Sequence, residues 1–589
     1  MKVLLTVLNA KYIHSSLALR YLQSYCQSSS EEITISEYSI NHKLLDVLAD
    51  IYVQKPKIIG LACYIWNIDL TLALAAMLKQ VMPESIIVLG GPEVSYDPAE
   101  VLRANNAVDF VVQGEGEEVL LQLLTALRGS GEIAAISGLS WREKGQVYTN
   151  GCPQQVASLD SLPFPYSDKD LSELKEKIVY YESSRGCPFS CQYCLSSATS
   201  GVRFLSLNRV FQDLKRLIDA DVRQVKFVDR TFNAKKEHYL PILQFLAKQQ
   251  CRTNFHLEIA ADILDEEGLA FLKDAPNNRF QMEIGIQSTY EPTLAEIQRK
   301  NNWPRIVDHV TRLRSYGNMH LHLDLIVGLP YEGYDRFGQS FNDVFRLQPH
   351  MLQIGFLKML KGSGIRKSAD RHGYEFTAYA PYEVLKNSYM SYDEIRRLHL
   401  LEDVFDHIYN SGRFTATVKW LTEMNAGDAF HLFETLTAYW ENENLHRVAH
   451  SPKSIIRYIW NFCRMHYPQE AALGEQLLKF DALIGAKGTL RPDFLPWNEE
   501  QWGEEKNQFW RNDQIVRQYI EDYTFTTWRE LKRLYHIEVF PAAVLAQIAQ
   551  IPDDAGPDIP VLFIYTEDEV LWQVIKAADF NFGGTRFAL

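Results

Sequence analysis

Short apolar runs alternate with amphipathic segments along the first part of the chain. The runs 3–8, 57–63 and 85–89 have the length of buried strands, and the segment 16–27 has apolar residues at helical spacing. Strands that alternate with helices are typical of a parallel sheet covered by helices on both faces. The pattern therefore predicts a Rossmann-like, doubly wound α/β domain over residues 1–127, in which ligands bind beyond the carboxyl ends of the strands.

A second region repeats strand and helix at a step of about 25–45 residues. Its six expected strands are 178–183, 224–228, 254–259, 279–286, 319–327 and 351–357. Consecutive units of this kind build a barrel, whose functional site lies at the carboxyl ends of the strands. The pattern predicts a partial (β/α)6, TIM-like barrel over residues 178–380.

Two other regions lack this alternation. Residues 128–177 contain five glycines and a Leu-Pro-Phe-Pro-Tyr segment, a composition that is typical of turns and predicts a linker. Residues 381–589 have helical patterns rich in Tyr, Leu and Arg, with two late strands expected at 538–540 and 561–565. We expect this last part to form a mostly helical domain, whose role the sequence does not indicate.

Charge and hydropathy exclude some classes of partner. A net charge of −14 over 589 residues provides no overall basic surface for nucleic acid. The apolar run at the start of the chain is too short for the core of a secretory signal, and no stretch approaches the roughly 18 apolar residues of a membrane helix. We expect a cytoplasmic protein with neither a nucleic-acid nor a membrane partner.

Three of the eight cysteines, Cys187, Cys191 and Cys194, lie in a Cys-x-x-x-Cys-x-x-Cys loop directly after the first barrel strand. Three thiolates at this spacing can hold one [4Fe–4S] cluster and leave its fourth iron open to a further ligand. The alternatives are a zinc site and a chance clustering of cysteines, but a structural zinc ion needs a fourth protein ligand, and no nearby cysteine or histidine provides one. The spacing therefore favours the cluster.

The cysteine loop and the strands behind it resemble the radical S-adenosylmethionine (SAM) superfamily, over about residues 178–360. The resemblance implies that SAM binds the open iron and that residues at the strand ends hold the rest of the molecule. These residues are Asp229, Glu258, Glu283, Gln287, Arg299 and Asp324. Each has an ordinary structural interpretation when taken alone, but their order behind the cysteine loop favours a SAM site. Arg230 departs from the pattern, because relatives often carry a second Asp there.

Small residues follow three of the expected N-terminal strands, where glycine allows a ligand to approach the backbone closely. A doubly wound domain ahead of a radical SAM core resembles the cobalamin-binding domain of the cobalamin-dependent radical SAM family. The resemblance implies that the strand-end loops hold cobalamin, through Cys63, Asn67, Gly90, Gly91, Pro92, Gly114 and Glu115. The alternatives are the same fold without a cofactor and, for Cys63, a small core residue.

The loop after the first strand contains Tyr12, His14 and Ser15, which we also assign to the cobalamin site. The family's cobalt-ligating loop reads Asp-x-His-x-x-Gly, with the His as lower cobalt ligand and the Asp orienting its ring. Here His14 has the position of the His, but Tyr12 replaces the Asp and Leu17 replaces the Gly. Because the orienting carboxylate is missing, we expect His14 not to be a committed ligand, and ligation is the alternative.

The resemblance implies methyl transfer to an unactivated carbon or phosphorus centre, through a 5′-deoxyadenosyl radical and methylcobalamin. It also implies a small-molecule or peptide substrate and an electron donor such as flavodoxin or ferredoxin. A cobalamin-dependent radical SAM cyclase or ring-rearranging enzyme is the alternative within the family. A tRNA methylthiotransferase would need three N-terminal cysteines, and the sequence has only Cys26 and Cys63 there. A non-enzymatic cobalamin or redox sensor would not need the open iron.

Overall fold

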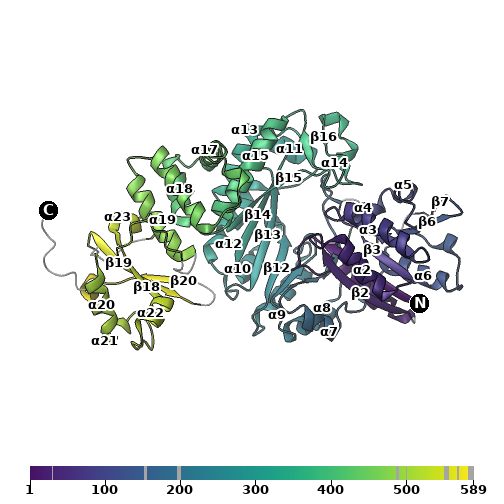
Figure 1. Ribbon diagram of the computed structural model, residues 1–589, viewed down its shortest axis with the longest axis horizontal. Coiled ribbons are helices and arrows are strands. Elements are labelled where there is room, and N and C mark those ends of the chain that lie inside the picture. The colour runs from purple at the N-terminus through teal and green to yellow at the C-terminus, as the bar shows by residue number, and fades with distance from the viewer. Residues whose placement is uncertain are drawn as a thin grey trace. The chain divides into compact units, whose positions relative to one another are not determined.

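The computed structural model describes residues 1–29, 31–151, 155–195, 201–485, 490–498, 501–549, 556–566 and 570–580. Within these residues the chain divides into two compact units, residues 1–395 and residues 396–589. The first unit contains both parallel sheets expected from the sequence (Figure 1). Cys152 lies outside the described residues.

The N-terminal sheet has seven strands in the order β2-β1-β3-β4-β5-β6-β7. The first five are parallel: β1 (Lys2–Asn9), β2 (Glu32–Ser39), β3 (Ile58–Ala62), β4 (Ile86–Gly90) and β5 (Phe110–Val112). The helices that follow these strands are α1 (Leu17–Tyr25), α2 (Leu44–Gln54), α3 (Ile68–Val81), α4 (Pro92–Ser95), α5 (Pro98–Ala104) and α6 (Gly116–Leu127). The doubly wound sheet is confirmed, and its order reverses between β1 and β3, where such sheets bind ligands.

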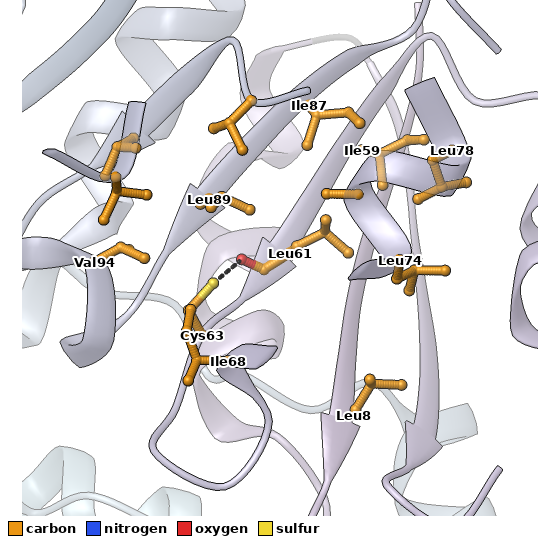
Figure 2. Close-up of a cluster of buried hydrophobic side chains, with 14 of the residues drawn as sticks. Leu8, Ile59, Leu61, Cys63, Ile68, Leu74, Leu78, Ile87, Leu89 and Val94 are labelled. Carbon is orange, nitrogen blue, oxygen red and sulfur yellow. Dashed lines mark hydrogen bonds between the residues drawn. The ribbon is translucent and has the colours of Figure 1, made fainter. Parts of the chain in front are cut away.

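Helices bury both faces of this sheet, which explains why its strands read as continuous apolar runs. One apolar cluster includes Leu8, Ile59 and Leu89 together with Leu74 and Leu78 of α3 (Figure 2). A second cluster is built on alternate residues of the same strands, packed against α1 and α6. Polar groups are therefore concentrated at the carboxyl edge of the sheet.

The region expected to be a linker, 128–177, contains two further strands of the N-terminal sheet. Strands β6 (Leu139–Glu143) and β7 (Gln146–Thr149) form an antiparallel hairpin on the edge of β5. Its two-residue turn consists of Lys144 and Gly145, both with positive φ, which is the geometry that favours tight hairpins. A short helix, α7 (Asp168–Glu173), precedes the barrel.

The barrel sheet has the order β15-β14-β13-β12-β11-β8, and all six strands are parallel. Its strands are β8 (Ile178–Tyr181), β11 (Gln224–Phe227), β12 (Asn254–Ile259), β13 (Phe280–Gln287), β14 (His320–Val327) and β15 (Met351–Phe356). The helices between them are α8 (Leu207–Asp219), α9 (Lys236–Ala247), α10 (Glu266–Lys273), α11 (Glu291–Glu296), α12 (Trp303–Tyr316) and α13 (Tyr334–Phe345) (Figure 1). Because β8 and β15 do not pair, the predicted partial barrel is confirmed.

The mostly helical domain was expected to begin at residue 381, but the chain there still forms a short hairpin. Strands β16 (Glu375–Phe376) and β17 (Val384–Lys386) pair after the short helix α14 (Gly364–Lys367), and α15 starts only at residue 392 (Tyr392–Phe405). The backbone of Val384 is already bonded to Leu357, just beyond β15, so it is not available to a helix. The first unit thus includes a small extension beyond the last barrel strand.

The second unit is mostly helical, as expected. Its helices are α16 (Thr415–Met424), α17 (Ala429–Asn442), α18 (Pro452–His466), α19 (Ala471–Gly485), α20 (Gly503–Arg511), α21 (Asp513–Val516), α22 (Trp528–Leu534), α23 (Ala542–Leu545) and α24 (Ala577–Phe580). Both expected late strands belong to an antiparallel sheet of β18 (Tyr535–Pro541), β19 (Asp558–Tyr565) and β20 (Val570–Val574). In the described part of the chain, none of the helices combines the length and the apolar character that a membrane crossing needs.

Candidate active site

The three clustered cysteines lie on a loop at the carboxyl end of the barrel, directly after β8. The chain leaves β8 through Glu182 and Ser183, forms the short strand β9 (Ser184–Gly186), and pairs it with β10 (Val202–Phe204). Gly186 has φ +109°, and a Cβ there would collide with the carbonyl oxygen of Gly201. Only glycine fits this close crossing, so the base of the cysteine loop has a defined backbone path.

The thiols of Cys187 and Cys191 have protein neighbours from the barrel. Cys187 Sγ lies 3.6 Å from Thr231 Oγ1, and the 6%-exposed Cys191 accepts a contact of 3.8 Å from Arg299 Nη1. Burial raises the pKa of the Cys191 thiol, while the Arg299 cation acts in the opposite direction. The backbone N–H of Cys194 donates to Cys191 O at 3.1 Å. Three thiols on one loop, one of them beside a buried cation, fit a cluster held by thiolates.

Arg299 and Gln287 lie together beside this loop. Arg299 donates to Tyr193 Oη at 2.9 Å and to the carbonyl of Gly285. Gln287 follows a bulge in β13 and has φ +72°, and its Nε2 occupies the space that a Cβ on residue 285 would need. Among the described residues, the buried Gln287 Oε1 has no hydrogen-bond partner. A buried acceptor without a partner is the kind of atom that a ligand satisfies.

Asp229 braces the base of the cysteine loop. Its fully buried carboxylate accepts hydrogen bonds from the Ser183 N–H at 2.9 Å and from the hydroxyls of Ser183 and Ser184, each at 2.6 Å. Burial raises the pKa of Asp229 to about 6, although these hydrogen bonds oppose the shift. The carboxylate therefore connects β11 to the turn that carries the cysteines. The two serines were missed by the sequence analysis, since their type gives no metal or cofactor signal.

A layer of charged side chains crosses the inner face of the barrel. Glu283 on β13 contacts Lys226 Nζ at 3.0 Å and His256 Nε2 at 2.7 Å. Burial opposes ionisation of Glu283, but the hydrogen bond from His256 and the charge of Lys226 lower its pKa to about 2. Burial, and then the neighbouring Glu283 charge, raise the pKa of Glu258 to about 7. Asp324 on β14 lies 3.0 Å from His322 Nε2.

The sequence analysis identified the three carboxylates of this layer but missed Lys226, His256 and His322. The signal was present, because polar residues recur at every second position of β12 and β14, at His256 and Glu258 and again at His322 and Asp324. Side chains two residues apart point to the same face of a strand. The three carboxylates therefore have protein partners or neighbours on adjacent strands of the barrel. Their positions at the strand ends, on which the sequence analysis relied, did not reveal these neighbours.

At the N-terminal sheet, three of the candidate cobalamin residues serve the fold directly. The Cys63 thiol is fully buried in the apolar cluster, with Sγ 3.6 Å from Leu61 O (Figure 2). Gly91 has φ +113°, and a Cβ there would lie 2.5 Å from Cys63 O. Asn67 is also buried and bonds Leu8 O and Ala62 O, each at 3.0 Å. These residues join the ends of β1, β3 and β4 at the edge where a ligand would bind.

The loops after β4 and β5 contact the barrel half of the same unit. Glu115 forms ion pairs with Arg203 and with Arg185, the latter at 3.3 Å, and accepts from Val156 N at 2.7 Å. Gly114 N donates to Ser95 Oγ at 3.2 Å. Pro92 is the first residue of α4, after Gly90 at the end of β4. The Glu115 carboxylate thus connects the two halves of the unit.

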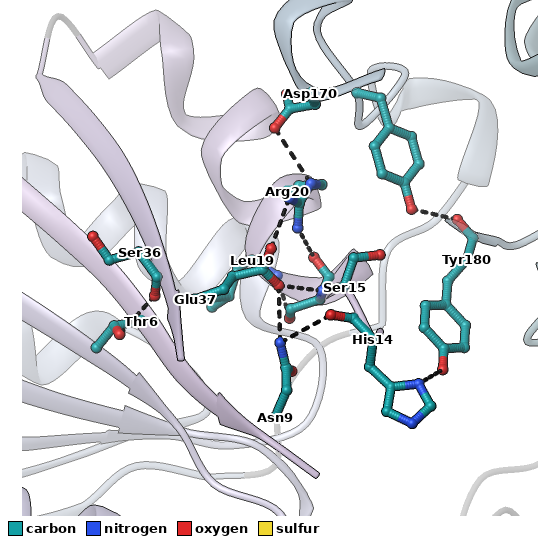
Figure 3. A network of polar contacts seen from close by, with 12 residues as sticks. Thr6, Asn9, His14, Ser15, Leu19, Arg20, Ser36, Glu37, Asp170 and Tyr180 are labelled. Atoms are coloured by element: carbon teal, nitrogen blue, oxygen red, sulfur yellow. Dashed lines mark hydrogen bonds and ion pairs between the residues drawn. The ribbon is translucent and has the colours of Figure 1, made fainter. Parts of the chain in front are cut away.

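The loop after β1 lies against β8, as Figure 3 shows. His14 Nδ1 is 2.7 Å from Tyr180 Oη, Ser15 Oγ donates to Ile178 O at 2.9 Å, and Ile178 N donates to Ile13 O at 3.0 Å. Burial lowers the pKa of His14, so its neutral form is favoured. Tyr12 is 74% exposed. The ring of His14 therefore has an orienting partner, Tyr180, that lies 166 residues away and could not be recognised from the local motif.

Family models and relatives agree with this arrangement. Residues 3–124 match the B12 binding domain, residues 181–344 match the radical SAM superfamily, and residues 370–563 match a protein family of unknown function, DUF4080. An uncharacterized methyltransferase of Pyrococcus horikoshii is 23% identical over 418 residues, which are 66% of this chain and 90% of the relative.

Two characterised relatives extend the comparison. The cobalamin-dependent radical SAM methyltransferase TokK of Streptomyces tokunonensis is 26% identical over 51% of this chain, but the match spans only 46% of TokK. The solved structure of the cobalamin-dependent SAM radical enzyme OxsB with aqua-cobalamin shares the fold, with a TM-score of 0.59, 15% identity and coverage of 84% of this chain and 82% of OxsB. The chain thus combines a B12-binding domain with a radical SAM domain, followed by a mostly helical part, and over the first two it is similar to cobalamin-dependent radical SAM methyltransferases.

Proposed function

We propose that the chain is a cobalamin-dependent radical SAM enzyme that transfers a methyl group to an unactivated carbon or phosphorus centre of a small-molecule or peptide substrate. The observation that carries this proposal is the cysteine loop at the carboxyl edge of the barrel, with Arg299 and the unpartnered Gln287 Oε1 beside it. When bound, the cluster and SAM supply a radical that removes hydrogen from the substrate, and cobalamin supplies the methyl group.

The chain's own residues have separate tasks in this scheme. Cys187, Cys191 and Cys194 would hold the cluster, and the Arg299 cation would stabilise the buried Cys191 thiolate. Gln287 Oε1, which is buried without a partner among the described residues, would accept a hydrogen bond from a hydroxyl or amino group of SAM. Because this acceptor is buried without a partner, SAM binding would both form a hydrogen bond and remove the free-energy cost of leaving a buried polar atom unsatisfied.

Glu258 is a second residue that we assign to binding the ligand. Its pKa of about 7 lets the side chain bind either as a carboxylate or as a neutral acid, so it can adjust to a charged or an uncharged group of the ligand. Glu283 lies level with Glu258 in the strand register, Asp324 lies opposite Gly285, and the family resemblance assigns both carboxylates to SAM as well. Asp229 acts as a positioning residue, because its carboxylate is occupied by Ser183 and Ser184.

The carboxyl edge of the N-terminal sheet fits cobalamin by its topology. The strand order reverses between β1 and β3, where doubly wound sheets bind nucleotide-like ligands. The loops of His14, Gly90–Pro92 and Gly114 surround that edge. Oxidation-sensitive thiols suit a reducing compartment, so we place the protein in the cytoplasm, with flavodoxin or ferredoxin as electron donor.

The test is anaerobic reconstitution of the full chain, followed by iron quantification, cobalamin extraction and mass analysis of SAM products under reducing conditions. Methyl transfer through this chemistry produces 5′-deoxyadenosine and S-adenosylhomocysteine together. Formation of neither product by cluster-loaded protein, with the relatives' substrate types supplied, would count against an enzyme and favour a sensor.

Cyclisation is the second candidate, supported by 29% identity over 125 residues to an anaerobic magnesium-protoporphyrin IX monomethyl ester cyclase of Synechocystis. That match covers 20% of this chain, so it carries less weight than the methyltransferase relatives. The same product analysis separates the two reactions. A cyclase yields 5′-deoxyadenosine without S-adenosylhomocysteine, because no methyl group leaves SAM.

A further inference from the structure

Three metal-ligand side chains, none of them a cysteine of the cluster loop, converge inside the barrel. Glu283 comes from β13, and His322 and Asp324 come from the neighbouring β14. In the strand register Glu283 pairs with His322, and Gly285 pairs with Asp324. One ligand atom from each of the three side chains lies within 4.8 Å of the others. Two adjacent strands thus bring one imidazole and two carboxylates to a single point on the inner face.

Two of the converging atoms are buried without a hydrogen bond. Within the described residues, His322 Nε2 and Asp324 Oδ1 have no partner with hydrogen-bond geometry, although the two atoms are 3.0 Å apart. The His322 side chain is only 8% exposed. Buried polar atoms are nearly always satisfied in folded proteins, so a misaligned nitrogen and oxygen at this distance indicate a missing partner between or beside them.

The neighbours of Glu283 prepare its carboxylate for a cation. Lys226 Nζ and His256 Nε2 both contact Oε2 of Glu283, so Oε1 remains for another bond. Metal-binding carboxylates are commonly held by such outer hydrogen bonds, which fix the orientation of the group.

We infer that Glu283, His322 and Asp324 bind a divalent first-row transition metal ion inside the barrel, separate from the iron–sulfur cluster. A donor set of one imidazole and two carboxylates suits Mn²⁺, Fe²⁺ or Zn²⁺ and not a thiolate-bound cluster. This assignment gives Glu283 and Asp324 a task other than SAM binding. The competing explanation is a simple His322–Asp324 ion pair, which needs no metal.

The test uses the full chain, freed of iron by chelation and titrated with Mn²⁺ in the absence of SAM and substrate. Mn²⁺ prefers oxygen and nitrogen donors, so the cluster cysteines do not compete for it. We expect one Mn²⁺ to be taken up per chain, seen as loss of the free-ion electron paramagnetic resonance signal. Electron spin-echo envelope modulation should then show coupling to one imidazole nitrogen. No uptake at millimolar Mn²⁺, or uptake without nitrogen coupling, would overturn the proposal in favour of the ion pair.

Near-isosteric variants keep the test meaningful if larger changes disturb folding. Glu283→Gln and Asp324→Asn preserve shape and should each weaken Mn²⁺ binding by at least about 10-fold, and His322→Ala should remove the nitrogen coupling. The matched control is His320→Ala. His320 lies on the same strand and face as His322, but its ring stacks on that of His350, with 5.0 Å between the ring centroids. Equal loss in His320→Ala and His322→Ala would refute the assignment. Because no turnover is measured, this result is independent of the proposed methyl transfer.

Discussion

The N-terminal sheet and the barrel sheet are both parallel, yet they distribute polar residues in opposite ways. In the N-terminal sheet two apolar clusters cover the two faces, and polar groups are concentrated at the carboxyl edge. In the barrel sheet one face carries charged and polar side chains along the strands. They are Lys226, His256, Glu258, Glu283, His322 and Asp324.

The difference follows from what covers each face. A doubly wound sheet is enclosed by helices on both sides, so a ligand can bind only beyond its strand ends. The barrel has helices on one side only, and its inner face is free to carry binding groups at several levels. One fold therefore offers a single edge for one cofactor, whereas the other offers an edge for the cluster and SAM with a further polar layer beneath it.

The largest expected effect is at the barrel edge. Cys187→Ala, Cys191→Ala or Cys194→Ala should each abolish the [4Fe–4S] absorbance and SAM cleavage, because three thiolates already leave one iron without a protein ligand. Cys463→Ala is the control, since this buried cysteine belongs to the second unit. A full four-iron cluster in any of the three loop variants would show that the cysteine assignment is wrong.

At the edge of the N-terminal sheet, Gly91→Ala should destabilise the fold rather than act only on a ligand. The new Cβ would lie 2.5 Å from Cys63 O at a φ of +113°, so we expect a loss of about 2–4 kcal/mol in unfolding free energy. Gly145→Ala is the matched control, because its φ is also positive but nothing lies within 4 Å of the added atom. Urea denaturation followed by circular dichroism measures both. Equal losses would mean that the Cys63 contact carries no energy.

The polar layer predicts an unusual pH dependence. The pKa of Glu258 is raised from 4.5 to about 7 in the folded chain, so its contribution favours folding below pH 4.5 and declines as pH rises through 7. Glu258→Gln should therefore stabilise the protein at pH 8 by about 1–3 kcal/mol and have little effect near pH 4. Denaturation of both proteins at the two pH values tests this. If Glu258→Gln instead destabilises the protein at pH 8, the ionised carboxylate must be stabilised by a partner rather than disfavoured by its burial.

The smallest effect is expected at His14, which lies at the carboxyl edge of the N-terminal sheet. We expect His14→Ala to retain cobalamin with an unchanged cobalt absorbance spectrum, because a phenol does not orient or polarise the imidazole as a carboxylate does. Tyr180→Phe, which removes only the hydroxyl 2.7 Å from Nδ1, should also leave the spectrum unchanged. A spectral change in His14→Ala would identify this residue as the lower ligand, and a smaller change in Tyr180→Phe would then show that the tyrosine supports it.

Much of the architecture could be predicted because buried parallel strands have a strong periodic signal. All six barrel strands were expected within three residues of their ends. The β6–β7 hairpin was missed because its strands are short and glycine-rich neighbours suggested a linker. The barrel layer was only half recognised, since pairing between His256 and Glu283 depends on lateral register that one strand does not reveal. The contact of Tyr180 with His14 joins residues from two folds, and local sequence carries no signal for it.

The hydrogen bonds between the β1–α1 loop and β8 also affect how the protein can be dissected. On the side away from β11, β8 is an edge strand of an open sheet, and Ile178 meets the backbone of Ile13 and the side chain of Ser15 there. An uncovered edge strand is a template for pairing with other chains. A barrel expressed without residues 1–151 would present this edge to solvent and tend to aggregate, so truncation experiments on this protein need the first sheet to remain attached.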